Sequence, residues 1–148
     1  MTNTDIHIER VKPHDAELQI TTAGEGPLVV LIHGFPETSY SWRHQITAIA
    51  QAGYKVIAPD MRGYATSDAP ENITDYDIFH LTADIAGLIR HYGGGPATVV
   101  GNDWGAMVTW AFAQFRPDLL NGIAAMSVPY MPPIEKSCLI YTSDAADE

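Results

Sequence analysis

The stretch VVGNDWGAM, residues 99–107, joins a short apolar run to a pattern typical of an α-helix. At its centre, Gly101, Asp103 and Gly105 have the spacing of the Gly-x-Ser-x-Gly nucleophile elbow, with aspartate in place of serine. Glycines at both outer positions indicate that the strand and the helix nearly touch. Asp103 is expected at positive φ, which aspartate tolerates better than most residues. The stretch therefore predicts a buried strand, a tight turn that presents one carboxylate, and a helix.

The carboxylate of Asp103 has the chemistry of a nucleophile. It is expected near the N-terminus of the following helix, whose dipole favours a negative charge. An aspartate has a reference pKa of about 3.9, so it is ionised at neutral pH and needs no base before it attacks. It suits displacement at a saturated carbon, which gives an alkyl-enzyme ester. The structural alternative is that Asp103 only caps the helix, as aspartates often do.

A second loop favours the interpretation of Asp103 as a nucleophile over that of a helix cap. This loop contains His33, Gly34, Phe35 and Pro36. An ester on Asp103 collapses through a tetrahedral oxyanion, which needs backbone N–H donors fixed in advance. Trp104 supplies one N–H from the elbow, and Phe35 is expected to supply the other. We interpret His33 as a structural residue beside this oxyanion hole, in preference to a general base.

The rest of the chain alternates strand and helix patterns. Polar–apolar alternation predicts an antiparallel hairpin over 6–11 and 16–22, and β-branched runs predict buried strands after it. Helical spacing of apolar residues predicts the helices. The buried strands are expected at 27–34, 55–60, 97–101 and 121–128, and the helices at 39–52, 78–92 and 104–115. This order predicts an α/β fold: a mostly parallel sheet with an N-terminal antiparallel hairpin and helices on both faces.

Several side chains outside the two loops are interpreted as structural. Trp42 is expected in the core, and Asp60 and Arg62 are expected to form an ion pair that braces the long surface loop over 62–77. No metal site is predicted. The remaining histidines are interpreted as surface or packing residues: His7, His14, His44, His80 and His91.

Composition excludes some classes of partner. The chain has 148 residues and a formal net charge of −10, which argues against nucleic acid and against an anionic membrane surface. No apolar run approaches the roughly 20 residues that span a bilayer. The N-terminal residues lack the apolar segment of a secretory signal, so a cytoplasmic location is expected. Cys138 is the single cysteine and has no intrachain partner.

Four segments together resemble the epoxide hydrolases of the α/β-hydrolase superfamily, over residues 5–133. They are HGFPE with YSWRHQI (33–37 and 40–46), AGYKVIAPDMRGYATSDAP (52–70), GNDWGAMVTW (101–110) and SVPY (127–130). The resemblance implies Asp103 as nucleophile, Phe35 and Trp104 as oxyanion-hole amides, a small apolar epoxide as substrate, and no cofactor. It implies that a histidine-activated water then releases a vicinal diol. The family usually has Gly-Tyr-Gly where this chain has Gly63-Tyr64-Ala65, a departure that affects loop flexibility.

Two other functions stay open at this point. Haloalkane dehalogenases share the aspartate elbow and the following tryptophan, but they often carry asparagine where Phe35 stands, so Phe35 favours the epoxide. A non-catalytic binding module on a hydrolase scaffold is the second alternative, since fold does not fix function.

No histidine follows Asp103 in this sequence, although the triad order places acid and histidine after the elbow. The resemblance implies that the acid, the histidine and two lid tyrosines lie beyond this chain. We therefore expect residues 1–133 to be the N-terminal part of a hydrolase core that cannot complete turnover alone. Residues 134–148 are expected to be a non-homologous tail, disordered or artefactual. The oligomeric state is not predicted.

Overall fold

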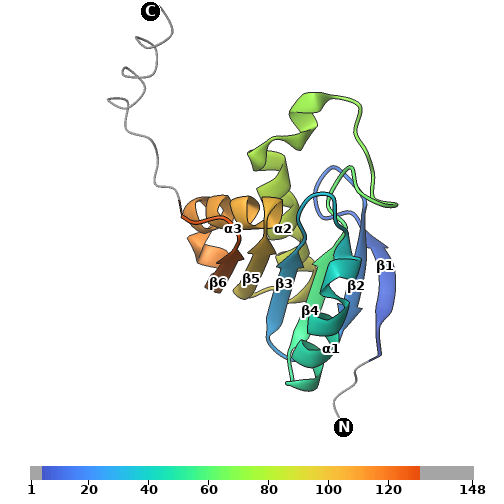
Figure 1. Cartoon of the computed structure of the whole chain (residues 1–148), viewed down its shortest axis with the longest axis vertical. Helices are drawn as coiled ribbons and strands as arrows, with labels where there is room; N and C mark the ends of the chain where they lie inside the picture. The colour runs from blue at the N-terminus through green and yellow to red at the C-terminus, as the bar shows by residue number, and fades with distance from the viewer. Residues whose placement is uncertain (1–4, 131–148) are drawn as a thin grey trace, which may run out of the picture.

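A six-stranded sheet runs through residues 5–130, the part of the chain that the computed structural model describes (Figure 1). The strand order is β1-β2-β4-β3-β5-β6. The strands are β1 (His7–Val11), β2 (Leu18–Ala23), β3 (Leu28–Ile32), β4 (Lys55–Pro59), β5 (Ala97–Asn102) and β6 (Leu120–Met126).

Pairing directions follow the predicted topology. β1 pairs with β2, and β2 with β4, in antiparallel fashion, whereas β4, β3, β5 and β6 are parallel neighbours. A parallel neighbour can be reached only by a crossover, and each crossover here carries a helix. The predicted N-terminal hairpin and the mostly parallel sheet are both confirmed.

Three α-helices cover the sheet: α1 (Arg43–Gln51), α2 (Ile78–Tyr92) and α3 (Trp104–Phe115). Three short 3₁₀ turns accompany them: η1 (Ser39–Trp42), η2 (Ile73–Tyr76) and η3 (Pro117–Leu119). The predicted helix over 39–52 therefore begins with a 3₁₀ turn. There the Thr38 side chain accepts the N–H of Tyr40 at 3.3 Å. Gly53, at φ +87°, follows α1 and stops it as predicted.

Apolar side chains form a core on each face of the sheet. α2 and α3 pack on one face, where Ile85 and Phe112 share a buried cluster with Val30. α1 packs on the other face, where Ile46 shares a second cluster with Leu31. These side chains are almost fully buried. Trp42 belongs to the α1 side and is 7% exposed, which confirms its predicted place in the core. Helices on both faces, as predicted, are visible in Figure 1.

The prediction that Asp60 and Arg62 pair with each other is wrong. Asp60 accepts hydrogen bonds from Ser39 N at 2.6 Å and Gln19 Nε2 at 2.8 Å. The chain turns at once, with Tyr64 N–H donating to Met61 O at 3.0 Å. Arg62 is thereby directed away from Asp60 and into the protein, where its side chain is fully buried.

Arg62 joins three separate segments from its buried position. Its Nε and Nη2 donate to the two carboxylate oxygens of Asp84 on α2, each at 2.7 Å. Nη2 also donates to Asp15 in the β1–β2 turn at 2.6 Å, and Nη1 donates to the backbone oxygen of Asp75 at 2.6 Å. The segment predicted as a plain surface loop is therefore anchored to the hairpin and to α2.

Among residues 5–130 no helix combines the length and the apolar character needed to cross a membrane. The predicted tail, residues 134–148, and Cys138 lie outside the described residues.

Candidate active site

The elbow predicted at 101–105 forms between β5 and α3. Asp103 has φ 54° and ψ −120°, the positive φ that the sequence predicts. A Cβ on Gly101 would lie 2.1 Å from the backbone oxygen of Gly105, and a Cβ on Gly105 would lie 2.2 Å from that of Ile32. Both contacts are closer than any side chain tolerates. The glycines therefore let the strand and the helix approach, as expected.

The Asp103 carboxylate faces the second predicted loop. Phe35 N–H donates to Asp103 Oδ2 at 3.0 Å. Hydrogen bonds from the backbone N–H groups of Phe35 and Trp104 hold the pKa of Asp103 below its usual range. Beyond the N–H of Trp104, the first residue of α3, the carboxylate accepts no N-cap hydrogen bond from the helix, which weakens the helix-cap alternative. The structure thus brings together one carboxylate and the two amides named from the sequence.

Gly34 leaves space for this approach, because a Cβ there would lie 2.6 Å from the Cβ of Asp103. The loop is closed by Glu37 N–H, which donates to Gly34 O at 3.0 Å, and the Phe35–Pro36 peptide bond is cis. On the other side, Asp103 N–H donates to Met126 O in β6 at 3.2 Å. Both sides of the elbow are therefore held by backbone contacts.

His33 lies beneath the loop and is 2% exposed. Its Nε2 accepts the N–H of Met61 at 3.0 Å, so Nδ1 carries the proton and donates to Gly34 O at 2.9 Å. Burial lowers the pKa of His33. Both ring nitrogens of a neutral imidazole are thus occupied by backbone groups. This arrangement supports the structural interpretation of His33.

An apolar pocket of about 360 Å³ opens beside the elbow. Phe35 and Trp104 line it and are 63% and 56% exposed. A second pocket of about 400 Å³ adjoins it. The two pockets share four lining residues: Tyr76, Leu81, Trp104 and Val108. Such a site suits a small apolar molecule.

Most of the residues that line the first pocket were not predicted from the sequence as site residues. Leu81 and Val108 occupy apolar positions on α2 and α3 that a helical pattern does not distinguish from core positions. Tyr64 follows the second parallel strand, and that place at the carboxyl end of a strand is the one signal that could have singled it out. Burial and the charge of Asp103 raise the pKa of Tyr64. Of the histidines in residues 5–130, His33 is the one that lines this pocket.

Comparisons with known proteins agree with this architecture. A family model for the alpha/beta hydrolase fold matches residues 27–137. Epoxide hydrolase A of Mycobacterium tuberculosis (strain ATCC 25618 / H37Rv) is 50% identical over 124 residues, which cover 82% of this chain and 38% of that protein. Epoxide hydrolase 3 of Siraitia grosvenorii is 40% identical over 122 residues, which cover 82% of this chain and 39% of that protein.

Solved structures give the same result. The crystal structure of Epoxide Hydrolase A from Mycobacterium thermoresistibile matches with a TM-score of 0.87 and 44% identity, over 97% of this chain and 46% of that chain. Epoxide hydrolase VrEH1 from Vigna radiata matches with a TM-score of 0.86 and 42% identity, over 96% of this chain and 46% of that chain. This chain therefore spans less than half the length of these relatives.

The parallel strands, the Gly-x-Asp-x-Gly elbow at the end of β5 and the helices on both faces define an α/β protein of hydrolase architecture. The chain belongs to the alpha/beta hydrolase fold family.

Proposed function

We propose that this chain carries the nucleophilic half of an epoxide hydrolase site. The observation that carries the proposal is the hydrogen bond of 3.0 Å from Phe35 N–H to Asp103 Oδ2, next to an apolar pocket. This bond holds one carboxylate oxygen and leaves Oδ1 to attack. The relatives named epoxide hydrolases supply the substrate class, an epoxide, and the apolar pocket favours a small apolar one.

In the first step, Asp103 Oδ1 attacks one epoxide carbon. A new C–O bond forms between this carbon and Oδ1, and the ring C–O bond breaks. The epoxide oxygen leaves with the electron pair and takes a proton from water. The product is a hydroxyalkyl ester of Asp103, formed without a cofactor.

In the second step, water adds to the ester carbonyl. The resulting oxyanion forms on Oδ2, which accepts the Phe35 N–H, and the Trp104 N–H, which also bonds to this carboxylate, is the second donor that would stabilise it. That addition needs a base to remove a proton from water. No histidine follows Asp103 in the sequence, and His33 has both nitrogens bound. We infer that the 148-residue chain forms the ester and hydrolyses it slowly.

Incubation of the chain with styrene oxide, followed by intact mass measurement, tests this inference. We expect one stoichiometric adduct that maps to the peptide containing Asp103. Hydroxylamine should release it, because it cleaves an ester but not a thioether formed on Cys138. Asp103→Asn should abolish the adduct. Asp118→Asn, a change at an exposed carboxylate paired with Arg116, is the matched control and should leave it unchanged.

Four outcomes would change the conclusion. Adducts that persist in Asp103→Asn would remove Asp103 as the nucleophile. Steady diol release by the unmodified chain would remove the inference of slow hydrolysis but keep the nucleophile. A lack of adduct with a folded protein would favour a binding module, and an adduct formed only from an alkyl bromide would favour dehalogenase chemistry.

A further inference from the structure

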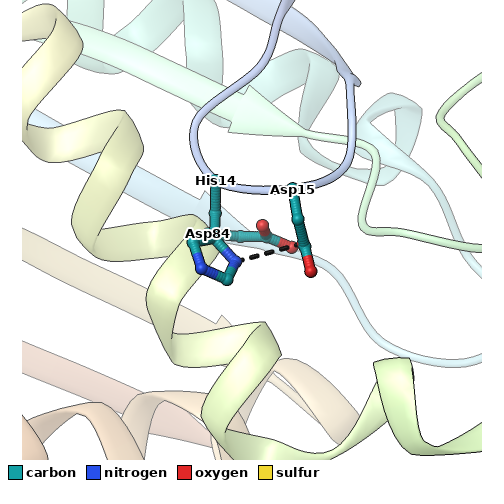
Figure 2. Close-up of side chains that lie close together, drawn as sticks. All are labelled: His14, Asp15 and Asp84. Carbon is teal, nitrogen blue, oxygen red and sulfur yellow. Dashed lines mark hydrogen bonds and ion pairs between the residues drawn. The ribbon is translucent and has the colours of Figure 1, made fainter.

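The β1–β2 turn lies against α2, away from the elbow. A Cβ on Gly87 of α2 would lie 2.2 Å from the backbone oxygen of Pro13, so the turn and the helix are in close contact there. Figure 2 shows His14 and Asp15 on the turn, with Asp84 reaching toward them from α2. This packing places the carboxylate of Asp15 beside the helix.

His80, in the first turn of α2, lies between two carboxylates. Its Nδ1 lies 2.8 Å from Oδ1 of Asp77, the N-cap residue of the helix, and its Nε2 lies 3.6 Å from Oδ2 of Asp15. A neutral imidazole carries one N–H, so either tautomer leaves a nitrogen lone pair facing a carboxylate. An imidazolium has an N–H on both nitrogens and faces each carboxylate with one of them. The geometry therefore suits the charged ring.

We propose that His80 is a pH-operated clamp, whose protonated ring ties the β1–β2 turn to the start of α2 through Asp15 and Asp77. Deprotonation of the ring breaks the tie to Asp15. Tyr76, which directly precedes Asp77, lines both apolar pockets, so the clamp steadies one wall of these pockets when it is closed. The clamp is separate from the Asp103 elbow and does not depend on the proposed hydrolase function.

The titratable and charged groups around His80 and its partner on the turn come from the turn itself, from the loop after β4 and from α2. They are His14, Asp15, Arg62, Asp77 and Asp84.

These groups leave one oxygen of Asp15 to His80. Arg62 Nη2 donates to Asp15 Oδ1 at 2.6 Å, and His14 Nδ1 lies 3.1 Å from the same oxygen. Arg62 also donates to both oxygens of Asp84, which balances that charge. Oδ2 of Asp15 thus faces His80, whose ring centroid lies 6.0 Å from that of His14.

The balance of these charges favours the protonated ring. The hydrogen bond with Asp77 raises the pKa of His80 above its usual value, and the charge of Asp15 adds to this effect. Burial and the charge of Arg62 oppose it. A pKa raised by folding means that protonation stabilises the fold. This stabilisation is complete below about pH 6.5 and is lost as pH rises through the higher pKa of the folded state.

Nuclear magnetic resonance of the histidine rings, followed in the tag-free chain from about pH 5 to 9, tests the two contacts of the ring. We expect His80 to titrate with a midpoint above about 6.5. Asp15→Asn and Asp77→Asn should each move this midpoint to lower pH, because each removes a negative charge that faces the ring. Both variants should fold, since asparagine keeps the N-cap of α2 and its oxygen can still accept from Arg62.

Urea unfolding of the unmodified chain and of His80→Gln, at about pH 6 and about pH 8, tests the stabilisation. The difference between the two midpoints should be larger at the lower pH, and it cancels the contribution of His33, which both proteins share. The amide of Asp77 donates to Thr74 O in η2 at 3.3 Å. Its protection from hydrogen exchange should be higher at the lower pH, and His80→Gln should remove this change. His44→Gln, on the exposed side of α1, is the matched control and should differ from the unmodified chain equally at both pH values.

A His80 midpoint at or below about 6.5, or one that neither aspartate variant moves, would overturn the proposal. So would a midpoint difference in urea that is the same at both pH values. Equal protection of the Asp77 amide at both pH values would overturn the link to Tyr76. The effect of His80→Gln should persist in a His14→Gln background, and its loss there would assign the pH dependence to His14. Circular dichroism checks that each variant folds, and the ring titration of the unmodified chain decides the proposal where a variant does not.

Discussion

The buried ion pair between Arg62 and Asp84 should be the most sensitive electrostatic contact of the fold. Both side chains have 0% exposure. Burial raises the pKa of Asp84 more than the hydrogen bonds from Arg62 lower it. Burial also disfavours the charge on Arg62, but its bonds to Asp84 and Asp15 outweigh this effect and raise its pKa. Each charge is therefore kept in the interior by its partner.

Arg62→Met should lower the free energy of unfolding by about 3–5 kcal/mol, the cost of breaking a buried pair by removing one partner. Within residues 5–130, the Asp84 carboxylate accepts two side-chain hydrogen bonds, and Arg62 donates both. At about 1.5–3 kcal/mol for each charged bond, their loss gives a similar figure. Asp84→Leu should cost less, about 2 kcal/mol, because Arg62 keeps Asp15 and the backbone oxygen of Asp75.

The double variant Arg62→Met/Asp84→Leu measures the coupling energy of the ion pair, because it removes both charges together. A hydrophobic pair of similar volume is often as stable as the ion pair it replaces, so this variant should be more stable than Arg62→Met alone. The cost of Arg62→Met should also shrink as pH falls. An unpaired Asp84 has a raised pKa in the folded state, so its charge destabilises the fold at neutral pH and is removed by protonation.

Urea unfolding followed by tryptophan fluorescence measures these values. With a slope of about 1–3 kcal/mol/M, Arg62→Met should lower the midpoint by roughly 2 M at neutral pH. A loss below about 1 kcal/mol for Arg62→Met would refute the reasoning. So would a double variant whose loss equals the sum of the two single losses, because the pair would then have no coupling energy.

Two further predictions concern single residues. Ala65→Gly should stabilise the protein by about 0.5–1 kcal/mol. Ala65 has φ 48°, and this positive φ costs a non-glycine residue about 1–2 kcal/mol, which glycine avoids. A lower urea midpoint in the variant would contradict this prediction. Burial lowers the pKa of His33, so protonation favours the unfolded state and stability should fall as pH drops below about 6.5. His33→Gln should lessen that fall between about pH 7 and 5, and an unchanged pH profile would show that His33 does not cause it.

The sequence predicted most of the fold because each element is marked locally. The bounds predicted for α2 and α3, 78–92 and 104–115, are those observed, since helical spacing and a following glycine or proline mark both helices. The elbow was predictable for the same reason: its strand, turn and helix are contiguous, and its glycines are required by contacts within a few residues and with β3.

Contacts between distant segments were not predictable in this way. Arg62 was assigned to Asp60, its near neighbour, but it pairs with Asp84 and Asp15. Periodicity shows that a residue faces inward but not which helix or turn it meets there. His14 and His80 were each interpreted singly for this reason, and the contact of His80 with Asp15 appears only once the β1–β2 turn packs on α2.

The place of β3 in the sheet has a consequence for synthesis of the chain. All five residues of β3 are buried, and its neighbours are β4 and β5. β5 begins at Ala97, about 65 residues after β3 ends. At roughly 5–20 residues per second, one edge of β3 stays uncovered on the ribosome for roughly 3–13 s. The speed of translation across residues 33–97 therefore sets how long an apolar strand edge of the nascent chain is open to aggregation.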